Sequence, residues 1–166
     1  MSNKEFEFFW NGPFSNWYPA RFSMDTEYGR KTFNCAEQAM MFFKAKMFKD
    51  EAAADLIMRS DSPKEQKAIG RLVKNFNADK WGNECLDIVT AIEIAKFSSD
   101  PILTKILLET DGKEIVEASP YDTIWGVGLA EDDPRILFKK SWKGKNYLGI
   151  CLMNAREYLK EQQHVA

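Results

Sequence analysis

The sequence has few of the residues that build metal centres or disulfide frameworks. Its 166 residues contain one histidine, His164, and three widely spaced cysteines: Cys35, Cys85 and Cys151. No CxxC pair occurs, so neither a zinc site nor a set of disulfides is expected. The acidic run at 131–133 is more typical of a solvated turn and helix cap than of a metal site. We therefore expect no metal, no other cofactor and a reducing compartment.

Long apolar runs and a strong excess of one charge are also absent. Residues 1–10 lack the apolar region of a signal peptide, and no stretch reaches the length of a membrane span. These features predict a cytoplasmic protein without membrane association or an obligate protein partner. The net charge is −2, so a broad nucleic-acid-binding surface is not expected, although a local basic patch remains compatible with this charge.

The patterns that are present predict one mainly helical domain, residues 1–166. Aromatic and polar residues alternate around Asn-Gly-Pro at 11–13, which predicts a strand and a second extended segment within 6–24, then a hairpin at 25–33. Helices are predicted from residue 35 onward and at 49–60, 62–73, 79–97, 100–111 and 145–162, with a strand at 113–119. The predicted fold class is α+β, mainly helical with a small β-sheet.

The segment CAEQAMMFFKAK, residues 35–46, predicts a helix with an acid and an amine on one apolar face. Glu37 and Lys44 point the same way about 10 Å apart along the axis, which is too far for a local ion pair. Such a pair could line a ligand cavity. In the alternative, Asn34 is the N-cap, Glu37 completes a capping box, and Lys44 extends into solvent.

The loop EASPYDTIWGVG, residues 117–128, is a second candidate. It brings Asp122 and Trp125 together just before Gly126, and glycine lets a backbone amide approach a ligand. An aspartate on such a loop can bind a sugar hydroxyl or act as a general acid or base. The alternative is a structural turn around a core tryptophan.

Two weaker groups complete the list of candidates. Ser15 and Asn16 offer short polar side chains within PFSNWYP at 13–19. Arg71 lies near Trp81, and these residue types commonly bind phosphate and stack on flat rings. An exposed arginine at a helix end is the alternative.

Taken together, these pieces resemble the NADAR (YbiA-like) family. The matching motifs run through nearly the whole chain in the family's order: FSNWYP at 14–19, AEQAMMFFKAKMF at 36–48, IGR at 69–71, Trp81, KF at 96–97, WGVGL at 125–129, DP at 133–134 and WKGKNYLGICLMNARE at 142–157. The number and spacing of these motifs make the resemblance specific.

The resemblance implies an N-glycosidase that hydrolyses the C1–N bond of an ADP-ribosylated or ribosyl-phosphate small molecule. The implied substrates are riboflavin-pathway intermediates or ADP-ribosyl-guanine, with ADP-ribosylated DNA or RNA as a macromolecular partner. The family pattern places the acid at Glu37, the basic residue at Lys44, and the loop motif at Asp122, Trp125 and Gly126.

These roles make chemical sense. A carboxyl group can stabilise the positive charge that develops on ribose, and a desolvated lysine can form a Schiff base with C1 of the opened sugar. Arg71 and Lys96 are then candidates for phosphate, and Trp81 and Trp125 for stacking or pocket walls. The rival hypothesis is an ADP-ribose or nucleotide-binding module without turnover, which needs no reactive Glu37 or Lys44.

Overall fold

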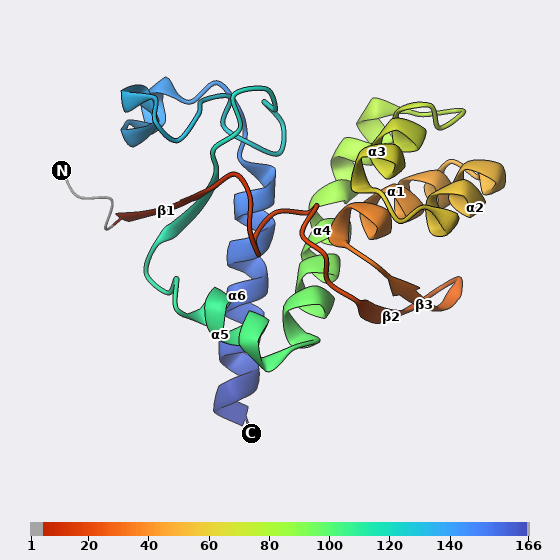
Figure 1. Ribbon diagram of the computed structural model, residues 1–166, viewed down its shortest axis with the longest axis horizontal. Coiled ribbons are helices and arrows are strands. Elements are labelled where there is room, and N and C mark those ends of the chain that lie inside the picture. The colour runs from red at the N-terminus through yellow and green to blue at the C-terminus, as the bar shows by residue number, and fades with distance from the viewer. Residues whose placement is uncertain (1–4, 166) are drawn as a thin grey trace.

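The structure is a computed structural model that describes residues 5–165 (Figure 1). Its strands form two pairs. β1 (Phe6–Phe9) pairs in parallel with β4 (Glu114–Glu117), and β2 (Phe22–Thr26) pairs antiparallel with β3 (Gly29–Phe33). The β2–β3 pair is the predicted hairpin, whereas the β1–β4 pair joins strands from the two ends of the chain, which no local pattern announces.

Helices make up most of the remainder, which confirms the predicted α+β class. They are α1 (Ala36–Met47), α2 (Glu51–Arg59), α3 (Pro63–Arg71), α4 (Ala78–Ser98), α5 (Pro101–Leu108) and α6 (Tyr147–Val165), with short 3-10 helices at Pro134–Leu137 and Lys139–Ser141. The predicted starts of α3 and α5 are confirmed: Ser62 and Asp100 each accept a backbone N–H, and proline follows each cap.

The predicted N-cap of α1 is wrong by one residue. The N-cap is Cys35, which makes no side-chain capping bond, so Glu37 is the second helical residue. Gln38 makes a bond of the capping-box kind, because its Oε1 accepts the N–H of Asn34, the residue before the N-cap, at 2.7 Å. The Asn34 side chain instead donates to the carbonyl of Ser60 at 2.9 Å. Capping therefore gives no account of Glu37.

Two central helices organise the packing. α4 and α6 run side by side, with α1, α2 and α3 to one side and the β1–β4 pair to the other (Figure 1). The main core lies among these elements, and its largest fully buried apolar side chains include Phe33, Phe97, Ile57, Ile92, Leu107 and Leu152.

A smaller core supports the long loop that follows β4. Its buried members come from the strand, the loop and the 3-10 helix Pro134–Leu137: Val116, Ala118, Val127, Leu129 and Ile136. This packing explains why residues 118–133 are held in place without helix or strand. The loop carries the predicted Asp122, Trp125 and Gly126.

Candidate active site

Glu37 lies at the first turn of α1 and is 4% exposed. Its backbone N–H donates to the carbonyl of Asn16 at 2.9 Å, which ties the start of the helix to the predicted polar loop. Burial raises the pKa of the Glu37 carboxyl to about 7, because desolvation disfavours its charged form. At neutral pH this group is therefore divided between its protonated and ionised forms, as suits a general acid or base.

Lys44 lies two turns further along α1 and is half-buried. Its Nζ is 4.6 Å from the centroid of the Phe76 ring, so the amine lies against an aromatic face. Burial lowers the pKa of Lys44; the charge of Glu37 opposes this shift, and that of Arg71 adds to it. Lys44 therefore does not simply extend into solvent, as the alternative interpretation expected.

α3 brings positive charge to the same region. Its backbone lies directly on α1 at Gly70, where an added Cβ would come within 1.9 Å of the Met41 sulfur. Lys67 and Arg71, one turn apart on α3, both oppose the rise in the pKa of Glu37. Lys67 has the larger effect and was missed from the sequence, although its four-residue spacing from Arg71 is visible there.

The loop that follows β1 carries Ser15 and Asn16. Asn16 is buried, and within the described part of the chain its Oδ1 has no hydrogen-bond partner. An orphaned acceptor beside Glu37 is costly unless a ligand or water satisfies it. Ser15 instead stabilises its own loop, since its Oγ accepts the N–H of Trp17 at 3.1 Å.

Lys96, predicted as a candidate for binding phosphate, is bonded to backbone carbonyls instead. It is fully buried on α4, and its Nζ donates to the carbonyls of Pro13 and Ser15 at 2.6 and 3.0 Å. Glu93, one turn earlier, is also fully buried, and burial raises the pKa of its carboxyl to about 7, with Lys96 opposing the rise. Burial lowers the pKa of Lys96, and Glu93 opposes that shift. Through these hydrogen bonds Lys96 holds the loop that carries Ser15 and Asn16 against α4.

Replacing Lys96 by Met should therefore destabilise the fold. It leaves the carbonyls of Pro13 and Ser15 without their donor, at a cost of roughly 1–3 kcal/mol, and removes the positive charge that opposes the rise in the pKa of Glu93. The loss should be larger at pH 8 than at pH 6, because Glu93 must ionise in its buried site as pH rises through its folded pKa. Thermal melts at both pH values measure this, and adding Glu93→Gln should recover part of the loss. A raised KM at an unchanged melting temperature would instead support a phosphate-binding lysine.

Asp122 orients the loop after β4. Its Oδ1 accepts the N–H groups of Ile124 and Trp125 at 2.9 and 2.8 Å, and its charge raises the pKa of Glu37. The ring of Trp125 meets Tyr147 edge-on at 5.9 Å between centroids. The structure thus brings Asp122 near Glu37, but one of its oxygens is already used by the loop.

Glu117 is another carboxyl group that sequence reasoning missed. It ends β4 and is half-buried, and its Oε2 is buried without a hydrogen-bond partner among residues 5–165. Burial, together with the charges of Asp122 and Glu37, raises the pKa of Glu117 to about 7. A Cβ on Gly126 would come within 2.9 Å of this Oε2, so only glycine leaves the carboxyl its space. Glu117 is the last residue of its strand, and nothing in the strand pattern distinguishes it from a surface acid.

The structure does not give Trp81 a defined place in this site. Trp81 lies in the first turn of α4, is half-buried and packs against the main core. Lys44, Arg71 and Asp122 are the predicted residues whose charges act on Glu37. The candidate site is thus the region around the start of α1, between α3 and the loop after β4.

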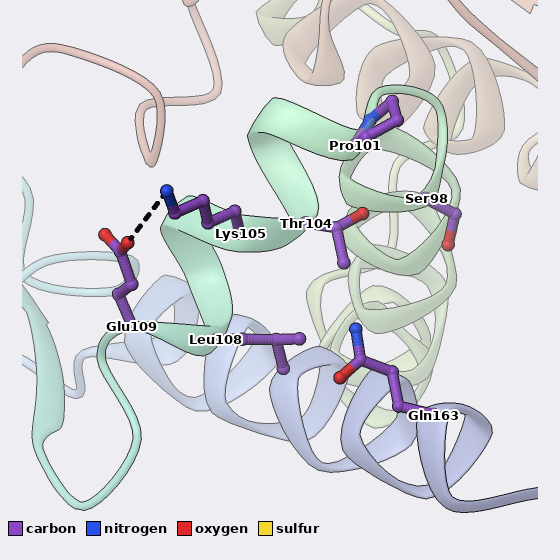
Figure 2. A pocket seen from close by; sticks show the side chains of 7 residues that line it. All are labelled: Ser98, Pro101, Thr104, Lys105, Leu108, Glu109 and Gln163. Atoms are coloured by element: carbon purple, nitrogen blue, oxygen red, sulfur yellow. Dashed lines mark ion pairs between the residues drawn. The ribbon is translucent and has the colours of Figure 1, made fainter.

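Two open hollows lie elsewhere on the surface. One of about 590 Å³ lies where α4, α5 and α6 meet, and it holds the ion pair of Lys105 and Glu109 at 3.9 Å (Figure 2). The other, of about 610 Å³, is lined by Pro120, Asp133, Arg135 and other loop residues. No predicted site residue lines either hollow.

Two further findings concern metal ligands and membrane spans in the described part of the chain. Within residues 5–165, no three or more His, Cys, Asp or Glu side chains are grouped as metal ligands. None of the helices in this range combines the length and apolar character needed to cross a bilayer.

Known proteins resemble this chain along most of its length. It is 43% identical over 148 residues to an N-glycosidase of Acanthamoeba polyphaga mimivirus, an alignment that covers 87% of this chain and 85% of the viral one. It is 33% identical over 153 residues to the chloroplastic riboflavin biosynthesis protein PYRR of Zea mays, covering 87% of this chain and 23% of PYRR.

The fold is also shared with a solved structure. The NMR structure of the E. coli protein YbiA matches with a TM-score of 0.76 at 25% identity, covering 99% of this chain and 90% of YbiA. The NADAR domain itself matches residues 8–160. The resemblance drawn from the sequence motifs is confirmed, and the chain belongs to the NADAR domain family.

Proposed function

We propose that this protein is an N-glycosidase that hydrolyses the bond between C1 of ribose and a nitrogen. The observation that carries the proposal is the buried Glu37, with a pKa of about 7, on the same helix as an amine whose pKa burial lowers. An acid and an amine tuned toward neutrality in this way are suited to proton transfer and nucleophilic attack at physiological pH. The names of the viral relative and of YbiA relatives from Shigella, all N-glycosidases, support the same reaction.

The chemistry divides between these two groups. Protonated Glu37 gives its proton to the departing nitrogen, which otherwise leaves as a poor anion. Lys44, in its neutral form, attacks C1 of ribose as the C1–N bond to the base breaks. The C1–O4′ bond then opens, a proton from Nζ passes to O4′, and an imine joins C1 to Nζ. Water adds to this imine and releases the sugar aldehyde and the free lysine. Glu117 adds a second carboxyl group, and Asp122 keeps the loop beside it in position.

The substrate carries phosphate in this proposal. Lys67 and Arg71 place two cations on one side of α3 near Glu37, and a lysine–arginine pair suits a phosphate or diphosphate. This is consistent with an ADP-ribosylated or ribosyl-phosphate compound, either ADP-ribosyl-guanine in nucleic acid or a riboflavin-pathway intermediate. The relationship to the riboflavin biosynthesis protein PYRR favours including the second class.

A binding module for ADP-ribose without turnover is the rival hypothesis. It would use the same cations and aromatic walls, but it gives no reason to bury Glu37 and Glu117 at a cost in stability. Two carboxyl groups whose pKa values are raised to about 7 favour the enzyme, because binding alone does not require groups that titrate near neutrality.

Release of free base from a small substrate panel tests the proposal. The panel contains ADP-ribosylated guanosine, ADP-ribosylated DNA, a riboflavin-pathway ribosylamine phosphate and NAD, with chromatography as the readout. We expect hydrolysis of at least one ribosyl substrate, undiminished by EDTA, because the proposed scheme uses only side chains. Binding of ADP-ribose without any turnover would favour the rival module, and loss of activity in EDTA that a divalent ion restores would contradict the metal-free scheme.

A further inference from the structure

The parallel pairing of β1 and β4 brings two aromatic residues to one edge. Phe9 and Glu117, the last residues of the two strands, are partners in the ladder, and the N–H of Ala118 donates to the carbonyl of Phe9 at 2.7 Å. The segments that follow the strands therefore leave the same edge side by side. In folds with parallel strands, the carboxyl ends of neighbouring strands are where ligands commonly bind.

Trp10 and Tyr121 are these residues. Trp10 is 42% exposed and Tyr121 is 85% exposed, and their rings meet edge-to-face with centroids 6.2 Å apart. An edge-to-face contact uses the edge of one ring and leaves broad π-faces open. The pair thus leaves apolar surface in contact with water.

The backbone that carries Tyr121 is fixed in a hydrogen-bonded turn next to Asp122. Ser119 is buried, and its Oγ accepts the N–H groups of Tyr121 and Asp122 at 3.2 and 2.9 Å. Asp122 in turn accepts two further backbone N–H groups of the loop. These hydrogen bonds hold the turn that carries Tyr121, which is one residue from Asp122 and four from Glu117 in the sequence.

We propose that Trp10 and Tyr121 form an aromatic platform that stacks the planar base departing from C1. This inference rests on the proposed N-glycosidase function, because the leaving group is what lies next to the groups that handle its proton. Flat heteroaromatic bases suit open π-faces, whereas the sugar and phosphate suit the polar groups and the cations of α3. The platform is separate from Trp81 and Trp125, whose rings are half-buried among other side chains.

Trp10→Ala and Tyr121→Ala test the platform, with Tyr121→Phe as the variant that keeps the ring. Loss of one stacking ring should weaken binding of a base roughly 5- to 100-fold. We expect this loss in the Kd for guanosine, followed by NMR titration, and in kcat/KM for substrates that release an aromatic base. Tyr121→Phe should behave as wild type, and Phe138→Ala, which removes another exposed aromatic ring, should change nothing.

A ribosyl substrate with a small aliphatic amine as leaving group separates stacking from general damage. The alanine variants should hydrolyse it as wild type does, with unchanged melting temperatures, because both rings are exposed. Equal losses on aromatic and aliphatic leaving groups would overturn the platform, as would unchanged guanosine binding. So would a loss confined to ADP-ribose, which would assign the rings to adenine. The guanosine titration needs no turnover, so it tests the platform even if the proposed hydrolysis fails.

Discussion

Glu37→Gln should abolish turnover and leave the fold in place. A positioned general acid contributes roughly 100- to 10,000-fold to a rate, and glutamine cannot give up a proton at neutral pH. The substitution keeps the size of the side chain, and the backbone N–H of residue 37 can still donate to the carbonyl of Asn16. Single-turnover release of base, compared at equal concentrations of folded protein, measures the loss.

The same substitution should not lower stability at high pH. Burial raises the folded pKa of Glu37 to about 7, so the folded state holds its proton more tightly than the unfolded state. Stability from this group is greatest below its ordinary pKa, falls as pH rises toward 7, and levels off above. A neutral glutamine has no such penalty, so Glu37→Gln should melt at or above the wild-type temperature at pH 8.

Glu51→Gln is a matched control, because it removes an exposed carboxyl group from the neighbouring helix α2, where Glu51 pairs with Lys46 at 2.7 Å. It should leave both turnover and the pH dependence of melting close to wild type. If Glu37→Gln melts far below wild type while its folded fraction keeps full activity, then Glu37 is structural.

Helices were predictable because their signals are local. Ser62 and Asp100 stand next to prolines, and such pairs specify a helix start whatever the rest of the chain does. The error at α1 has a tertiary cause. Asparagine is a favourable N-cap residue, but the side chain of Asn34 is hydrogen-bonded to Ser60 and Gln66 across the α2–α3 connection. The local bond at the start of α1 is instead made by Gln38, which accepts the N–H of Asn34.

The candidate site was only partly predictable for the same reason. The seven-residue spacing of Glu37 and Lys44 is a helix property and follows from the sequence, as does the glycine-containing loop with Asp122. Burial is not local. Glu117 looks like an ordinary strand residue in the sequence, and only the packing of Gly126 against its carboxyl group sets it apart. Lys96 likewise looks like an ordinary helix lysine, and only its bonds to the carbonyls of Pro13 and Ser15 set it apart.

The aromatic platform shows this limit most clearly. Trp10 and Tyr121 are separated by more than a hundred positions, and only the parallel register of Phe9 with Glu117 makes them neighbours. From the sequence alone, Trp81 and Trp125 were the predicted stacking residues because they lie near polar motifs.

Lys44→Arg should bind substrate but turn it over poorly. Arginine keeps the positive charge near Glu37, yet it is never deprotonated in proteins and cannot form the imine. An ordinary lysine, with a pKa near 10.4, is neutral in only about one molecule in a few thousand at pH 7. Burial and the charge of Arg71 lower the pKa of Lys44, against the opposing charge of Glu37, and so enlarge the reactive fraction.

Borohydride separates the covalent role of Lys44 from an electrostatic one. Hydride reduces the imine carbon to a stable secondary amine, so wild-type protein incubated with substrate and borohydride should gain the mass of the reduced sugar on a peptide containing Lys44. Lys44→Arg should bind ADP-ribose with a similar Kd and give no adduct. Lys46→Arg is the matched control: Lys46 is on the same helix, its Nζ is 2.7 Å from Glu51, and the variant should trap normally. Near-normal turnover by Lys44→Arg would rule out the covalent route and leave Lys44 as a cation that holds phosphate.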